Sequence, residues 1–189
     1  FFGVKDGDFG EVPYEFADVA AALNAVYPYD WAGFLQTRIN TPGQPAPLGG
    51  IEKAGYRLVW KEEPNPYDKG RTGSNLNLFH SLGVTLDKEG RVTATRWDSA
   101  AFNAGLVNGA RVLAVNGTAY DPAVMKAAIT EAKAPDKAVD LIIQRGEKVR
   151  LVSIPYHDGL RFPWLERTAG DGAPAGLDLL LAPRRSTTR

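Results

Sequence analysis

Residues 81–117 read SLGVTLDKEGRVTATRWDSAAFNAGLVNGARVLAVNG, and this stretch decides the fold. Its first part contains two short runs rich in β-branched residues, at 82–86 and 92–95. The turn-forming triplet Lys88-Glu89-Gly90 separates them. Two such runs around a turn predict a β-hairpin.

The second part of the stretch predicts a helical turn followed by another strand. The small residues at 99–105 can support one short helical turn. Residues 111–115 are mostly apolar and predict a strand that ends at Asn116-Gly117. That dipeptide suits a tight turn with positive φ.

The order of these pieces resembles a PDZ domain. The resemblance rests on the loop pattern x-Φ-G-Φ at residues 81–84, then on SAAFNAGL, and then on NGARVLAVNG. Ala100 and Ala110 stand where bacterial PDZ domains usually have a proline and an aspartate. The resemblance implies an α+β fold, with a small β-barrel or sandwich and one main helix.

The residues before the central stretch predict two helices and a connector. Apolar residues at Phe16, Val19 and Leu23 have helical spacing, and Pro28 ends that helix. Asp30 can cap a second helix. Two short amphipathic helices cannot cover each other's apolar faces, so they need a further partner. The sequence TPGQPAPLGG then predicts a connector and a boundary.

The residues after the central stretch predict a capped helix, a hairpin and a mixed tail. Asp121 is a natural N-cap, and Pro122 suits the first helical position. Residues 139–144 and 149–154 predict the two strands of a hairpin. Residues 177–182 predict a short helix or strand, and the last arginines read as a solvated terminus.

The flanking segments resemble one family of peptidases. The segments VPYEFADVAAALNAVYPYDWAGFLQTRI, PLGGIEKAGYRL and GLDLLLAPR resemble the C-terminal part of the glycyl aminopeptidase family of zinc metallopeptidases. Those proteins carry a thermolysin-like catalytic domain followed by a PDZ domain. The family's H-E-x-x-H motif is absent here, and the chain begins with Phe rather than Met. We therefore expect a piece of a longer protein, with the zinc in a domain upstream.

This resemblance sets the expected organisation of the chain. Residues 1–45 are the helical end of a peptidase domain, 50–156 the PDZ-like domain and 157–189 a C-terminal extension. Residues 62–77, which are rich in Pro and Gly, are expected to form a long mobile loop. The chain alone is expected to be inactive, with no catalytic residue, no metal ligand and no cofactor. The resemblance implies a bacterial protein and points to the periplasm or another extracytoplasmic location, while the residues themselves leave the compartment open.

The candidate site is a peptide-binding groove. A glycine in the loop lets main-chain amides converge on a carboxylate, and an extended peptide can add to the free edge of the next strand. By resemblance, two residues of the helix that begins at Asp121 would form the opposite wall. The predicted peptide-binding residues are Ser81, Leu82, Gly83, Val84, Thr85, Leu86, Met125 and Ile129. The alternative is that these residues fill the core and that the groove is unused or blocked by residues 62–77.

Other chemistry has little support in the sequence. Ser81, His80 and Asp87 form a nucleophile site on paper, but neighbouring strand residues point to opposite faces. His80 and His157 lack the spacing of a zinc site, and there is no cysteine. The 22 basic and 22 acidic residues balance, which gives no general attraction to nucleic acid or anionic lipid. No apolar run is long enough to span a bilayer.

Two functions therefore remain open. The first is a binding module that recognises an extended peptide or a protein C-terminus and assists an upstream zinc aminopeptidase. The second is a structural unit that packs on its own catalytic domain and never uses the groove.

Overall fold

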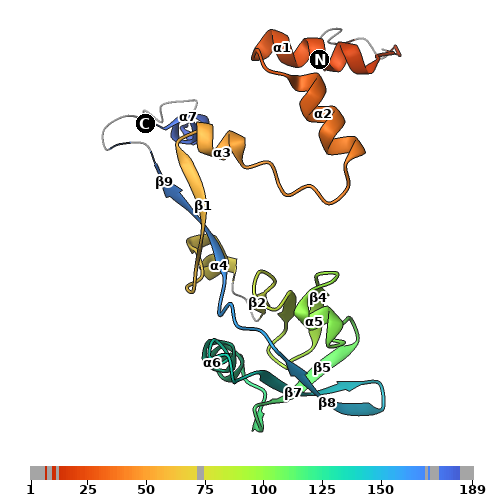
Figure 1. Ribbon diagram of the computed structural model, residues 1–189, viewed down its shortest axis with the longest axis vertical. Coiled ribbons are helices and arrows are strands. Elements are labelled where there is room, and N and C mark those ends of the chain that lie inside the picture. Colours follow the sequence, from red (N-terminus) through yellow and green to blue (C-terminus); the bar gives the residue numbers. More distant parts are fainter. Residues whose placement is uncertain are drawn as a thin grey trace. The chain divides into compact units, whose positions relative to one another are not determined.

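The computed structural model describes residues 7, 10, 11, 13–71, 75–168, 170 and 175–183 (Figure 1). The chain divides into two compact units, Phe1–Pro47 and Leu48–Arg189. The boundary between them lies within the connector that the sequence predicts at 41–50. The predicted arginines at 184, 185 and 189 lie outside the described residues.

The first unit consists of the two predicted helices, α1 (Phe16–Val26) and α2 (Trp31–Asn40). Asp30 caps α2, since its carboxylate accepts a hydrogen bond of 2.9 Å from the Gly33 amide. In the described part of this unit Ala20 is the only buried residue. The two helices therefore have almost no core of their own.

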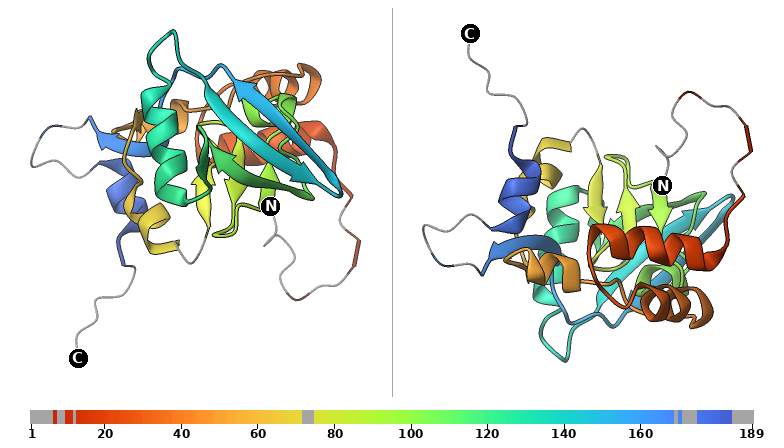
Figure 2. Two further views of the ribbon diagram at one scale, coloured as in Figure 1. Left: turned by 90° about the horizontal axis from the view of Figure 1, so that it is seen from below. Right: turned by 90° about the horizontal axis from the view of Figure 1, so that it is seen from above.

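The second unit is built around a four-stranded antiparallel sheet in the order β6-β5-β7-β8. The strands are β5 (Ala110–Val115), β6 (Thr118–Ala119), β7 (Val139–Arg145) and β8 (Lys148–Ile154). The long β7–β8 hairpin is clearest in Figure 2. Helix α6 (Pro122–Glu131) is capped as predicted, because the Asp121 carboxylate accepts a 2.7 Å hydrogen bond from the Ala123 amide.

A second, three-stranded sheet has the order β2-β3-β4. Its strands are β2 (Leu76–Leu78), β3 (Val84–Leu86) and β4 (Val92–Thr95), and α5 (Ala100–Asn103) follows them. One isolated bridge, Arg91 to Arg111, joins the end of this sheet to β5. Both sheets share one buried cluster of apolar side chains. The predicted α+β class is confirmed, and of the predicted barrel or sandwich the structure has open sheets and no closed barrel among the described residues.

A two-stranded ribbon joins distant parts of the second unit. Strands β1 (Tyr56–Lys61) and β9 (Phe162–Arg167) pair antiparallel along their whole length (Figure 1). The short helices α3 (Gly49–Lys53) and α7 (Gly176–Leu181) lie at its end. Asp178 of α7 accepts a hydrogen bond from the Tyr56 hydroxyl and forms an ion pair with Arg167 at 3.0 Å. These contacts attach the C-terminal residues to β1.

The predicted loop at 62–77 contains regular structure, which corrects the prediction. Helix α4 (Pro66–Arg71) begins after Asn65, whose side-chain oxygen accepts a 2.8 Å hydrogen bond from the Asp68 amide. Asn65 is thus an N-cap and Pro66 occupies the first helical turn, where its missing N–H costs nothing. The prediction treated Pro66 only as a loop residue and so missed the helix.

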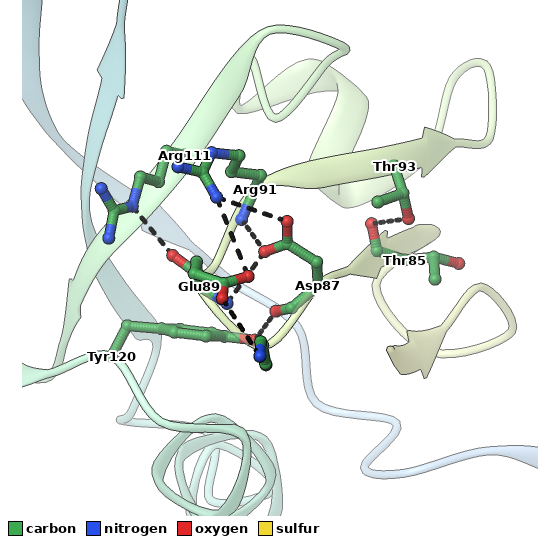
Figure 3. Close-up of polar contacts among 8 residues, drawn as sticks. Thr85, Asp87, Glu89, Arg91, Thr93, Arg111 and Tyr120 are labelled. Carbon is green, nitrogen blue, oxygen red and sulfur yellow. Dashed lines mark hydrogen bonds and ion pairs between the residues drawn. The ribbon is translucent and has the colours of Figure 1, made fainter. Parts of the chain in front are cut away.

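The turn between β3 and β4 is held by one carboxylate (Figure 3). Asp87 Oδ1 accepts hydrogen bonds from the amides of Glu89, at 2.9 Å, and Arg91, at 2.8 Å. The Arg111 side chain donates to the Glu89 carbonyl at 2.8 Å, and the Tyr120 hydroxyl donates to the Asp87 carbonyl at 3.1 Å. The turn is therefore attached to β5 and to the segment before α6.

Tyr120 should make the stability of the second unit sensitive to alkaline pH. Burial raises the pKa of its phenol to about 12, and the nearby Asp87 and Asp121 add to the rise. The folded state therefore favours the neutral phenol over the ionised one. The stability that Tyr120 contributes in this way is complete below pH 10.0, the ordinary pKa of a phenol, and is lost as pH rises towards about 12. We expect Tyr120→Phe to cost about 1 kcal/mol near neutral pH and to lose less stability than wild type on alkalinisation.

Urea unfolding near neutral pH and near pH 11 measures both effects. An unchanged alkaline loss of stability in Tyr120→Phe would show that other groups cause it.

Candidate functional site

The predicted recognition loop is closed by its own main chain. The carbonyl of Leu78 accepts hydrogen bonds of 3.0 Å from the amides of both Ser81 and Gly83. The Ser81 hydroxyl, which is buried, accepts a 3.0 Å hydrogen bond from the Arg161 amide. Two of the amides at the predicted carboxylate-binding loop thus already have partners within the chain.

Gly83 is required where the loop passes the start of α5. Its φ is +86°, and a Cβ at this position would lie 2.1 Å from the Ser99 Cβ. The Gly83 carbonyl accepts a 2.8 Å hydrogen bond from the Arg96 amide, and the Leu82 carbonyl accepts one of 2.9 Å from the Ala101 amide. The sequence motif SAAFNAGL therefore packs directly on the loop. This contact explains the glycine without any ligand.

Strand β3 has a partner on both of its edges. On one side it pairs with β2, with Val84 opposite Leu78 and Leu86 opposite Leu76. On the other side it pairs with β4, and the register shifts between Thr85 and Leu86. The predicted free edge is therefore occupied over the length of β3, so an added strand has no open ladder there.

The predicted apolar site residues come together, but in the interior. Leu82, Val84 and Leu86 are fully buried and belong to the same core cluster as Met125 and Ile129 of α6. Thr85 is the exception, because it is only partly buried, and its carbonyl accepts a 3.1 Å hydrogen bond from the Thr93 hydroxyl. The arrangement matches the alternative expectation, in which these side chains fill the core.

Strand β2, which the sequence did not predict, lies on the edge of β3 that was expected to be open. Leu76 and Leu78 are buried, and Asn77 between them is partly exposed. This apolar-polar-apolar alternation is the signature of a half-buried strand. It is only three residues long and follows a segment dense in Pro and Gly, so it did not stand out from a loop.

The nucleophile site considered from the sequence does not form. The Ser81 hydroxyl contacts the Arg161 amide, and the Asp87 carboxylate holds the β3–β4 turn. The His80 ring lies near Trp60, with centroids 5.2 Å apart. Burial lowers the pKa of His80 below its usual value, and the charge of Arg96 lowers it further. Each of the three groups therefore has a separate structural environment.

Other kinds of site are weakly represented. Among the described residues no group of three or more His, Asp or Glu is placed to hold a metal ion. No helix of the described part is long and apolar enough to cross a membrane. Two cavities of about 270 and 300 Å³ lie beside β1 and beside α5, and their linings do not include the predicted peptide-binding residues.

The comparisons with known proteins give a likeness of fold. No family model and no curated protein matches the chain. The chain is similar to the solved structure of an aminopeptidase N family protein from Idiomarina loihiensis, with a TM-score of 0.55 and 17% identity. The match covers 87% of this chain but only 28% of that protein. At this identity the likeness concerns the fold alone.

A second solved structure, the HtrA3 PDZ domain bound to a phage-derived ligand (FGRWV), matches less well. Its TM-score is 0.28 at 17% identity, and the match covers 63% of this chain and 98% of that domain. A TM-score this low carries no argument about function.

A pair of glycine variants tests how tightly the loop packs on α5. Gly83 and Gly109 both have a φ of +86°, but an added Cβ meets Ser99 at Gly83 and nothing within 4 Å at Gly109. We expect Gly109→Ala to lose about 1 kcal/mol through backbone strain alone. Gly83→Ala should lose about 3 kcal/mol, because overpacking adds to the strain.

Urea unfolding of both variants measures the difference. Equal losses in the two proteins would mean that the contact with Ser99 is not a constraint.

Proposed function

We propose that this chain is a non-catalytic accessory module of a larger aminopeptidase-related protein, and that it packs on the rest of that protein instead of capturing free peptides. The observation that carries the proposal is the pairing of β3 with both β2 and β4. The geometry favours this structural role over the peptide-binding role that the sequence also suggested.

Strand addition needs an open row of main-chain donors and acceptors. In this chain β2 uses one edge of β3 and β4 uses the other. The amides of Ser81 and Gly83, which a terminal carboxylate would need, donate to the Leu78 carbonyl. A free peptide would have to break these contacts before it gained any.

The first unit supports a docking role. Val26 of α1 and Ile39 of α2 are 86% and 72% exposed, and Phe16 is 41% exposed. Helices of this length are marginal in water unless an apolar face packs on a partner. We infer that these side chains contact the remainder of the larger protein.

The larger protein is proposed from two sources. The Idiomarina loihiensis structure is described as an aminopeptidase N family protein, and this chain matches only 28% of it. The sequence segments around the central stretch resemble glycyl aminopeptidases. In this proposal the catalytic zinc and the peptide-cleaving residues belong to the upstream part, and the protein is bacterial and extracytoplasmic.

A peptide titration tests whether the β3 edge is closed. We expect extended peptides at millimolar concentration to leave the amide resonances of Val84–Leu86 unshifted, because those groups are paired on both sides. Amides of the exposed strand β6 provide a control for nonspecific shifts. Saturable shifts confined to β3 would show that it recognises peptides and would reject the proposal.

Hydrogen exchange on the whole chain tests whether the helices lack a partner. We expect the amides of α1 and α2 to exchange through local opening, long before those of β5 and β7, because the first unit has almost no core. Val26→Ser with Ile39→Ser should leave the free energy of unfolding within about 0.5 kcal/mol of wild type. Protection in α1 and α2 equal to that in β7 would contradict this expectation.

A further inference from the structure

Strand β2 has the geometry of a bound extended segment. It runs antiparallel to β3 and pairs with it through three residues, Leu76 to Leu78. Within the described residues it has no other strand neighbour in its sheet, whose order is β2-β3-β4. β2 is therefore an edge strand of this sheet. It pairs with the edge of β3 that an added peptide strand would use.

Leu78 makes the contacts that are expected of the last residue of a bound peptide. Its carbonyl accepts hydrogen bonds from the amides of Ser81 and Gly83, each at 3.0 Å. Its side chain is fully buried and belongs to the core cluster that contains Met125 and Ile129. An acceptor on the loop amides and an apolar side chain in the cluster shared with α6 are the two features that the PDZ resemblance implies for an incoming peptide.

The other two residues of β2 have different roles, because one packs in the core and the other forms hydrogen bonds. Leu76 is buried in the same cluster as Leu78. The Asn77 side chain lies between them and donates a 3.2 Å hydrogen bond to Asp68 of α4, while its oxygen accepts one of 3.1 Å from the Phe79 amide. Alternate residues thus fill the core, and the middle residue attaches the strand to α4.

We propose that Leu76-Asn77-Leu78 is a ligand that the chain supplies to its own binding site. We call this site the β3 edge site, formed by the main chain of Val84–Leu86 together with Met125 and Ile129. With β2 removed, the β3 edge site takes an extended segment with leucine at alternate positions. The inference goes beyond the accessory role and stands whether or not the helices α1 and α2 dock on a larger protein.

The test compares an opened chain with a locked one. In the opened chain, Leu76→Gly with Leu78→Gly removes both buried side chains and weakens the strand. The locked chain carries the same two changes plus Asn77→Cys and Thr85→Cys. Those two positions are direct partners across β2 and β3, so a disulfide can join them. The natural sequence has no cysteine, so this disulfide forms alone.

The probe is a fluorescently labelled, end-blocked peptide that contains Leu-Asn-Leu, followed by anisotropy. We expect the opened chain to bind it at least tenfold more tightly than the oxidised locked chain, and reduction of the locked chain to restore binding. A peptide with the order Asn-Leu-Asn should bind neither form, because its side chains fall on the wrong faces. Equal affinity in opened and locked chains, or none in either, would overturn the proposal.

A milder variant guards against loss of folding. Leu78→Ala empties one leucine position of the β3 edge site, and Leu141→Ala empties an equally buried position in β7. We expect the Leu-Asn-Leu peptide to raise the Tm of Leu78→Ala by several degrees and to leave that of Leu141→Ala unchanged. The same response in both variants would show that β2 is an ordinary part of the core and not a replaceable ligand.

Discussion

The second unit depends on the position of β3 between two neighbouring strands. β3 is three residues long, and its main chain is paired with β2 on one side and β4 on the other. The chain can enter β3 only because Gly83 has a positive φ and no side chain against Ser99. It leaves through a turn that Asp87 holds with two amide hydrogen bonds. A short strand fixed at both ends in this way has little freedom to open.

The two units of the chain differ in how complete they are. The second contains one continuous buried cluster drawn from its three-stranded and four-stranded sheets and from α6. The first leaves residues such as Val26 and Ile39 exposed. The proposed accessory role uses this difference, because the well-packed second unit would supply stability and the exposed apolar residues of the first unit would supply attachment.

Local signals in the sequence were sufficient for the capped and periodic elements. Asp30 and Asp121 marked two helix starts, and the runs around Gly90 marked the β3–β4 hairpin. Pairing between distant segments could not be predicted from the sequence. Tyr56 lies opposite Arg167 across the ribbon, and no local sequence pattern around either residue indicates its partner. The apolar residues predicted for the candidate site share one buried cluster, but whether the edge of β3 is open depends on β2. A three-residue strand after a Pro-rich segment contains too few alternating apolar and polar residues to be predicted as a strand.

The short connection between β2 and β3 has a consequence for competition. Leu78 and Val84 are joined by the residues from Phe79 to Gly83, so the segment on the β3 edge never diffuses away from it. A tether this short gives an effective concentration on the order of millimolar. Dilution of the protein does not lower this effective concentration. A free peptide at micromolar concentration is therefore at a lower concentration than the tethered segment, whatever the protein concentration. Occupancy of the edge is thus governed by the covalent structure of the chain rather than by the supply of peptides around it.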